Sequence, residues 1–177
     1  MLNDPMQQPL VCVDIFDQVV GEASKAACHE RPLLHRAFSV FLYSEKGLLL
    51  QRRALEKYHS GGLWTNACCS HPRPTETLAE AVERGLRDEL GITAPCKEIA
   101  SFVYYHAFGP NLYEYEYDHV FLGKCTAPLK PNPAEIMEIA WVKPDVLARK
   151  LQERPEQFTV WFLTAAPLVL KALAQQP

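Results

Sequence analysis

Short runs of apolar, β-branched and aromatic residues recur along the chain, and runs of this kind favour β-strands. The clearest run covers residues 37–43 (Ala-Phe-Ser-Val-Phe-Leu-Tyr) and leads into the turn signal Ser-Glu-Lys-Gly at residues 44–47. A second apolar run at residues 48–53 follows at once, so the two runs predict a β-hairpin. Four further strands are predicted at residues 11–19, 98–106, 114–125 and 134–142.

Residues 75–90 have the period of an amphipathic α-helix instead. Their apolar stripe consists of Leu78, Val82, Leu86 and Leu90. Thr77 and Glu80 fit a capping box at the start of this helix, and Gly91 is placed to end it. Glu89 lies on the same side as part of the apolar stripe. A carboxylate that faces inward is a candidate for chemistry.

Further helices are predicted near the two ends of the chain. Residues 25–29 form either a short helix or a loop, and residues 143–177 are helical, with a helix start at Pro144 and a kink at Pro167 within residues 160–175. No internal repeat or linker interrupts the sequence. We therefore predict one mixed α/β (α+β) domain over residues 1–177, with an antiparallel-rich sheet flanked by helices and with residues 1–10 flexible.

Length and charge narrow the range of functions. The 177 residues are enough to bury one substantial core, and their net charge of −3 gives no reason to expect a nucleic-acid partner. No apolar run reaches the roughly 18–20 residues that span a bilayer. The N-terminus lacks the basic start and apolar core of a signal peptide. We expect a cytoplasmic protein without a membrane partner, either a monomer or a homodimer.

The cysteines are expected to be free thiols rather than disulfides. The chain has six of them, Cys12, Cys28, Cys68, Cys69, Cys96 and Cys125. A chain of this length without an export signal builds its own core and has no need of a disulfide framework. No Cys-x-x-Cys pair occurs, which argues against a structural zinc ribbon.

A thiol, imidazoles and carboxylates together indicate a metal site beside a proton-transfer site. Glu114 and Glu116 are two residues apart in a predicted strand, so their side chains share one face, where two carboxylates repel each other unless a cation lies between them. With three histidines they make a plausible ligand set: His29, His35, His71, Glu114 and Glu116. The alternative is that each histidine is an ordinary core or surface residue, and this is how His59, His106 and His119 are interpreted.

The residue types alone leave two interpretations open for several cationic and aromatic side chains. Lys25, Arg53 and Lys57 are either solvated surface residues or ligands of a phosphate, for which the fork of donors on arginine is suited. Tyr104 and Trp161 are ordinary core aromatics unless the rest of the site gives them a role.

Several motifs occur in an order that identifies a family. They are His29 with residues 35–39 (His-Arg-Ala-Phe-Ser), residues 51–57 (Gln-Arg-Arg-Ala-Leu-Glu-Lys), residues 62–72 (Gly-Leu-Trp-Thr-Asn-Ala-Cys-Cys-Ser-His-Pro), residues 88–91 (Asp-Glu-Leu-Gly), residues 114–119 (Glu-Tyr-Glu-Tyr-Asp-His) and Trp161. Over roughly residues 20–165 the chain resembles the type I isopentenyl-diphosphate isomerases of the Nudix superfamily. Two details depart from that pattern: His59-Ser60-Gly61 stands where a more apolar stretch with proline is usual, and the interval from His29 to His35 is short.

The resemblance implies a Nudix-like fold and a 1,3-proton shift that interconverts isopentenyl diphosphate and dimethylallyl diphosphate. It implies that Cys69 and Glu116 are the acid/base pair. It assigns one divalent metal, Mn²⁺, Zn²⁺ or Mg²⁺, to the ligand set His29, His35, His71, Glu114 and Glu116, and a Mg²⁺ bridging Glu89 to the diphosphate. It implies substrate contacts by Lys25, Arg53, Lys57, Tyr104 and Trp161.

Two other functions remain possible at this point. A Nudix hydrolase of a nucleoside diphosphate derivative would use a helix with an Arg-Glu pair and a later Glu-Glu pair, but this chain has Gly85 and Asp88 at two of those glutamate positions. A metal-binding or regulatory domain on an inactive Nudix scaffold would leave Cys69, Glu116 and Trp161 without a common role. The isomerase interpretation uses all of these residues.

Overall fold

Strand β3 (His35–Ser44) is the centre of the fold. In the computed structural model, which describes residues 4–175, it pairs with four other strands. It runs parallel to β8 (Leu112–Lys124) and antiparallel to β1 (Pro9–Val13), β4 (Gly47–Arg53) and β6 (Cys68–Ser70). The parallel register places His35 beside Glu116, so the fold itself brings two of the candidate ligands together.

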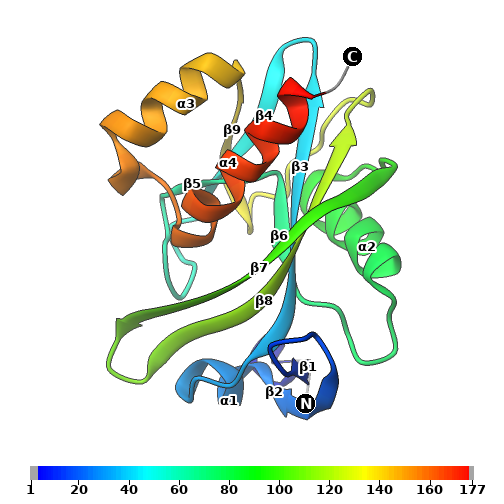
Figure 1. The fold of residues 1–177 in the computed structure, drawn as a ribbon, viewed down its shortest axis with the longest axis vertical. Helices are drawn as coiled ribbons and strands as arrows, with labels where there is room; N and C mark the ends of the chain where they lie inside the picture. The colour runs from blue at the N-terminus through cyan, green and yellow to red at the C-terminus, as the bar shows by residue number, and fades with distance from the viewer. Residues whose placement is uncertain (1–3, 176–177) are drawn as a thin grey trace.

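The other strands extend this sheet at its edges. They are β2 (Val19–Ser24), β5 (Trp64–Thr65), β7 (Cys96–Gly109) and β9 (Ile136–Val142). Strands β7 and β8 form a long antiparallel hairpin, which runs across the molecule in Figure 1. Among the described residues the sheet has nine strands and is mixed but mostly antiparallel, as the sequence predicts.

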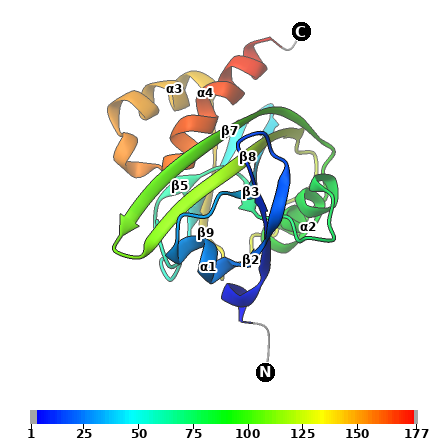
Figure 2. The ribbon, with the colours of Figure 1, turned by 60° about the horizontal axis from the view of Figure 1, so that its bottom comes forward.

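Helices cover both faces of the sheet. They are α1 (Lys25–Glu30), α2 (Leu78–Leu90), α3 (Pro144–Glu153) and α4 (Val160–Ala174), with short 3-10 helices at Pro5–Gln7 and Pro155–Gln157. Helix α2 lies on one side, whereas α3 and α4 lie together on the other, as Figures 1 and 2 show. Between residues 4 and 175, no helix combines the length and apolar character that a bilayer crossing demands.

Alternation along β3 divides the core into two parts. Phe38, Val40 and Leu42 belong to the apolar cluster under α2, whereas Phe41 belongs to the cluster under α3 and α4. Successive residues of a strand point to opposite faces, so one strand supplies both clusters. Trp161 is buried at the edge of the second cluster, where α4 begins.

The capping signals of α2 are confirmed. The Thr77 hydroxyl accepts a hydrogen bond from the backbone of Glu80, whose carboxylate accepts one from the backbone of Thr77, and Gly91 ends the helix at φ +66°. Such a cap stabilises a helix by about 1 kcal/mol. The helix begins at Leu78 rather than at residue 75, because residues 75–77 lead into the cap. Its last turn carries Glu89 inward, toward β4.

The structure corrects two other expectations and leaves a third untested. Residues 11–19 are not one strand: β1 and β2 are joined by a turn in which Asp14 binds the backbone of Phe16 and Gln18. The two short strands β5 and β6 were not predicted, since two or three residues are too few to show a period. The expected flexibility of residues 1–10 lies partly outside the described residues and stays a prediction, although Pro9 and Leu10 pair with β2.

Candidate active site

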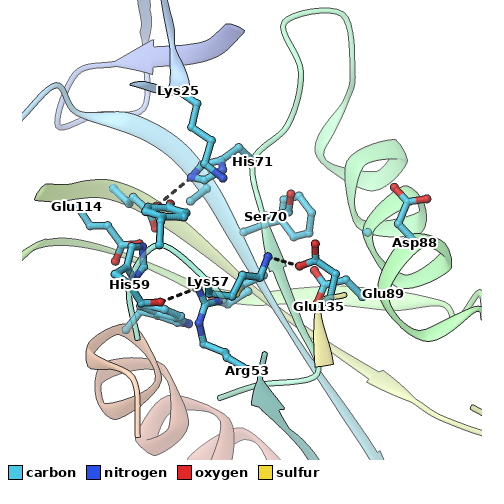
Figure 3. A pocket seen from close by; sticks show the side chains of 18 of the residues that line it. Lys25, Arg53, Lys57, His59, Ser70, His71, Asp88, Glu89, Glu114 and Glu135 are labelled. Atoms are coloured by element: carbon cyan, nitrogen blue, oxygen red, sulfur yellow. Dashed lines mark hydrogen bonds and ion pairs between the residues drawn. The ribbon is translucent and has the colours of Figure 1, made fainter. Parts of the chain in front are cut away.

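A cavity of about 470 Å³ opens between β6, β8, α2 and the loop that follows β4. Most of the predicted site residues line it: Lys25, Arg53, Lys57, Cys69, His71, Glu89, Tyr104, Glu114, Glu116 and Trp161. Figure 3 shows several of these side chains converging on one space from different elements. His29 and His35 lie behind the wall of this cavity, where both are buried.

Three imidazoles and one carboxylate meet at the inner end of the cavity. Ligand atoms of His29, His35, His71 and Glu116 all lie within 4.8 Å of one another. Nε2 of His71 is 2.9 Å from Oε1 of Glu116, and Nε2 of His35 is 3.5 Å from the same oxygen. These four residues form a cluster that could bind a metal.

Backbone carbonyls fix the orientation of two of the imidazoles. Nδ1 of His29 is 2.8 Å from the carbonyl oxygen of Lys25, and Nδ1 of His35 is 2.8 Å from that of Leu33. A carbonyl only accepts, so each Nδ1 carries the proton and each Nε2 keeps its lone pair. Metal-binding histidines are oriented by such partners on the second nitrogen. The two lone pairs therefore point into the cluster.

The donor set fits a divalent ion. Nε2 of His35 is buried and has no hydrogen-bond partner, although an unpartnered buried nitrogen of this kind is costly. Nε2 of His29 faces the hydroxyl of Tyr58 at 3.1 Å, and that of His71 faces Glu116. Imidazole and carboxylate ligands suit zinc, manganese and iron.

Burial keeps two imidazoles of this cluster, those of His29 and His71, neutral. It lowers the pKa of His29 to about 4 and the pKa of His71 to about 3, so both are unprotonated at neutral pH. For Glu116, burial raises the pKa, but the neighbouring imidazoles of His35 and His71 outweigh it and hold the pKa well below its usual range. Neutral imidazoles and an ionised carboxylate are the forms that bind a metal.

Glu114 is not part of this four-residue cluster. Glu114 precedes Glu116 by two residues on the same face of β8. The hydroxyl of Tyr104 is 2.9 Å from the carboxylate of Glu114 and 2.7 Å from that of Glu116. The other oxygen of Glu114 is 2.8 Å from Nε2 of His59. Burial, followed by the charge of Glu116, raises the pKa of Glu114 to about 8. Ligation by Glu114 therefore stays a prediction.

Cys69 faces the cavity from β6. Its backbone pairs with Ser39 of β3, which fixes the thiol in the wall. The pKa of the thiol is raised, mainly because burial disfavours a thiolate, and the charge of Arg53 opposes this only in part. Cys69 is thus a protonated thiol that has access to the same space as Glu116. All six cysteines are free, as the sequence predicts.

Three cations enter the cavity from two sides. In Figure 3, Lys25 lies near His71, Arg53 reaches toward His59, and Lys57 extends toward Glu135. Burial lowers the pKa of Lys25, and the positive charge of Lys57, which lines the same cavity, lowers it further. Lys57 is paired with Glu135. Nε of Arg53 is buried without a partner. This grouping favours an anion in the cavity.

Glu89 forms the far wall of the cavity, on α2. Its two oxygens accept hydrogen bonds from the Gln51 amide at 2.8 Å and from the Cys68 thiol at 3.2 Å. Burial raises the pKa of Glu89 to about 7, despite these two hydrogen bonds. A carboxylate this deep is available to a cation that enters with an anionic ligand.

The sequence interpretation missed some of the residues that line the cavity. His59, taken as an ordinary histidine, is buried there against Glu114, and Arg84 and Glu135 also line it. The departure of residues 59–61 from the family pattern is the one sequence signal that could have identified His59. Arg84 donates hydrogen bonds to Glu76 and to the backbone carbonyl of His71, which helps to fix the position of one member of the four-residue cluster.

Comparisons with known proteins agree with this geometry. Residues 33–162 match the NUDIX domain family. The chain is 46% identical over 158 residues to isopentenyl-diphosphate Delta-isomerase 2 of Photorhabdus laumondii, covering 89% of each chain. It is 45% identical over 166 residues to isopentenyl-diphosphate Delta-isomerase 2 of Aromatoleum aromaticum, covering 93% of this chain and 88% of the relative.

Solved structures support the fold alone, because their sequences are more distant. The protein DR0079 of Deinococcus radiodurans superposes with a TM-score of 0.74 at 23% identity, covering 90% of this chain and 98% of that one. The MutT protein of Methanosarcina mazei gives a TM-score of 0.64 at 20% identity, covering 81% and 96%. From the site, the domain match and the relatives together, this chain belongs to the isopentenyl-diphosphate Delta-isomerase family of NUDIX domain proteins.

Proposed function

We propose that the protein interconverts isopentenyl diphosphate and dimethylallyl diphosphate in isoprenoid biosynthesis. The observation that carries this proposal is the placement of a protonated thiol, a buried carboxylate and an aromatic wall around one cavity, at Cys69, Glu116 and Trp161. No hydrolysis needs this combination. The reaction adds one proton to the terminal carbon of the alkene. It removes another proton from the second carbon of the chain, counted from the carbon that is bonded to the diphosphate oxygen.

The diphosphate end of the substrate is assigned to the cationic side of the cavity. Lys25, Arg53 and Lys57 would contact its oxygens, and a Mg²⁺ entering with it would be held by Glu89. The diphosphate takes no part in the proton shift. Its binding energy orients the hydrocarbon end, which is how a remote group contributes to a rate.

The hydrocarbon end is assigned to the aromatic side. Protonation of an unactivated alkene gives a tertiary carbocation, which water would trap, so the site must be dry and without a free nucleophile. The indole of Trp161 is 3% exposed and already has the Arg53 guanidinium 5.2 Å from its ring. The same ring quadrupole that attracts this cation would stabilise a carbocation.

Cys69 and Glu116 are proposed as the two groups that exchange protons with the substrate. Two groups are needed because the proton arrives at one carbon and leaves from another. Tyr104 donates a hydrogen bond to Glu116 and would fix its orientation toward the substrate. General acid–base groups of this kind each contribute about 10²–10⁴ in rate.

A divalent ion is proposed at the cluster of His29, His35, His71 and Glu116, with Glu114 as a further ligand. Bound there, Mn²⁺, Zn²⁺ or Mg²⁺ would supply a fixed positive charge. Each of the three imidazoles would direct a nitrogen lone pair at this ion. Glu116 would then stay ionised and in place beside the substrate.

The rival function, hydrolysis of a nucleoside diphosphate derivative, is disfavoured by the packing of α2. A Cβ at Gly85 would lie 2.8 Å from Sγ of Cys68 and 3.2 Å from the ring of Phe38. There is no room for the glutamate that a hydrolase helix carries at this position. The neighbouring Asp88 is largely exposed, so one buried carboxylate, Glu89, remains on this face.

A direct assay separates the two reactions. The purified protein with Mg²⁺ is incubated with isopentenyl diphosphate, and in parallel with a panel of nucleoside diphosphate derivatives. We expect dimethylallyl diphosphate from the first and no phosphate or monophosphate from the second. The Cys69→Ala variant should lose isomerisation. Release from the nucleotides, retained in Cys69→Ala, would replace the proposal with the hydrolase.

Two further expectations stay predictions. A cytoplasmic location would be tested by fractionating the cells that make the protein. A monomeric or homodimeric state would be tested by sedimentation at several concentrations. Neither affects the assignment of the reaction.

A further inference from the structure

His59 lies in the loop between β4 and β5, at the departure from the family pattern. Its side chain is buried, at 7% exposure, and its ring stacks on Phe108 with centroids 4.2 Å apart and planes 17° apart. Tyr58 and Trp161 meet the same ring edge-on, at 4.3 Å and 5.9 Å between centroids. Aromatic contacts on three sides limit the movement of the ring.

The loop backbone is as constrained as the ring. The backbone oxygen of His59 accepts a hydrogen bond from Arg53 at 3.3 Å. Ser60 has φ +53°, in the left-handed region that few residues other than glycine adopt. At Gly61, a Cβ would lie 2.5 Å from the backbone oxygen of Leu55. A backbone held this tightly supports a fixed function for the side chain.

The ring nitrogens of His59 have different neighbours. Nδ1 is 3.2 Å from the hydroxyl of Ser60, which can donate to it. Nε2 is 2.8 Å from Oε1 of Glu114. The N–H direction is not aligned well enough for a hydrogen bond, and Nε2 has no other partner. A proton on Nε2, which a small ring rotation would align with the carboxylate, satisfies both nitrogens.

Glu114 needs a hydrogen-bond donor other than Tyr104. The Tyr104 hydroxyl is within hydrogen-bond distance of both Glu114 and Glu116, but it has one proton. It therefore donates to one carboxylate at a time. When both are ionised, as they would be as ligands of the proposed ion, two carboxylates that meet at one hydroxyl repel each other unless each has a donor of its own. Among the described residues, the remaining donor at hydrogen-bond distance from Glu114 is His59.

We propose that His59 is a positioning residue of the metal site: its Nε2–H holds the Glu114 carboxylate next to the histidine cluster and leaves the Tyr104 hydroxyl to Glu116. Nothing in the resemblance assigns a role to this position. The inference rests on the proposed metal site and not on the isomerase reaction. It makes the polar loop at residues 59–61 part of the site rather than a neutral variation.

The test compares variants that differ in the donor. Metal-free protein is titrated with Mn²⁺, and the free ion is measured by electron paramagnetic resonance. His59→Gln keeps an N–H at similar reach, His59→Met has similar length without a donor, and His59→Phe keeps the aromatic stack without a donor. The control is His106→Phe, since His106 also packs against Phe108 but does not line the cavity.

We expect His59→Met and His59→Phe to weaken Mn²⁺ binding by about 10–100-fold, the usual cost of losing a partner that orients a metal ligand. His59→Gln should recover most of the affinity, and His106→Phe should bind as the wild type does. The melting temperature in EDTA should separate folding from binding. If His59→Phe fails to fold, the comparison of His59→Gln with His59→Met still decides whether the donor is needed.

Three results would overturn the inference. Wild-type affinity in His59→Met would show that the donor is not needed. Equal losses of Mn²⁺ affinity in His59→Gln and His59→Met would show that the ring of His59, and not its N–H, is needed. Absence of Mn²⁺ binding in the wild-type protein would overturn the metal site and this inference together, whereas isomerisation by that same preparation would leave the proposed reaction standing.

Discussion

Strand β8 contributes one residue to each of two groups of histidines and carboxylates, and the groups differ in which ring nitrogens they leave free. The inner group is the cluster of His29, His35, His71 and Glu116. The outer cluster consists of Asp17, Arg36, Glu98 and His119. In it, Nδ1 of His119 is 2.8 Å from Glu98, Nε2 is 3.1 Å from Asp17, and Arg36 donates to Asp17 at 2.7 Å.

The difference lies in the partners of the ring nitrogens. In the inner cluster, two Nδ1 atoms are used by backbone carbonyls, and the lone pairs of Nε2 converge. In the outer cluster, both nitrogens of one imidazole face carboxylates. Similar residue types thus give a cluster that could hold a cation in one place and a closed set of polar contacts in the other. The outer cluster ties the turn between β1 and β2 to the β7–β8 hairpin.

The largest effect should separate the two carboxylates that face histidines. Glu116→Gln should lower kcat by about 10²–10⁴, because it removes one of the two groups proposed to exchange a proton with the substrate. Glu98→Gln removes the same charge from the outer cluster and should leave kcat close to the wild-type value. Initial rates of dimethylallyl diphosphate formation measure both. Equal losses in the two variants would contradict the distinction.

The second effect concerns pH and the inner cluster. Burial lowers the pKa of His29 from 6.5 to about 4, so the folded protein binds fewer protons than the unfolded chain between these values. Stability is therefore present above pH 6.5 and is lost as pH falls toward 4, by up to ~3 kcal/mol for this group. Urea unfolding in EDTA between pH 4 and 7 measures it. His29→Gln should flatten the slope, and an unchanged slope would refute the assignment.

The third effect is stabilisation by a metal. A ligand at 100 times its Kd stabilises the folded protein by about 2.7 kcal/mol. Calorimetric scans with and without Mn²⁺ should show this gain in the wild-type protein and in His119→Ala. His35→Ala should lose it, because its Nε2 points into the inner cluster. A gain in His35→Ala that vanishes in His119→Ala would place the metal in the outer cluster.

The smallest effect should come from the outer cluster. His119→Gln removes a hydrogen bond to one of two partly exposed carboxylates and should cost about 1 kcal/mol of stability. At saturating metal, kcat should stay near the wild-type value. Urea unfolding and initial rates report on the two expectations separately. A large loss of kcat with little loss of stability would show that the outer cluster takes part in the reaction.

Local patterns predicted most of the fold. The capping box at Thr77 and the glycine at position 91 bound α2, and the hairpin of β3 and β4 follows from its apolar runs and turn. The turn at residues 14–18 was missed, since Ile15 and Phe16 continue the apolar pattern although both are exposed. The turn depends on hydrogen bonds of Asp14 to the backbone, which no pattern of apolar residues reveals.

The site was predictable where residues are close in sequence or share a known motif. The two-residue spacing of Glu114 and Glu116 places both side chains on one face, and the structure confirms that both are buried there. The contact of His59 with Glu114 joins residues far apart in the chain, and it depends on the tight loop at Ser60 and Gly61. Such a contact is fixed by tertiary packing and not by spacing.

One measurement tests the central claim most directly. The protein is incubated with isopentenyl diphosphate and Mg²⁺ in D₂O, and the proton NMR spectrum is followed over time. We expect deuterated dimethylallyl diphosphate from the wild-type protein and from Glu98→Gln, but not from Cys69→Ala or Glu116→Gln. Isomer formation that persists in both Cys69→Ala and Glu116→Gln, or no isomer and no deuterium in the wild-type reaction, would contradict the account.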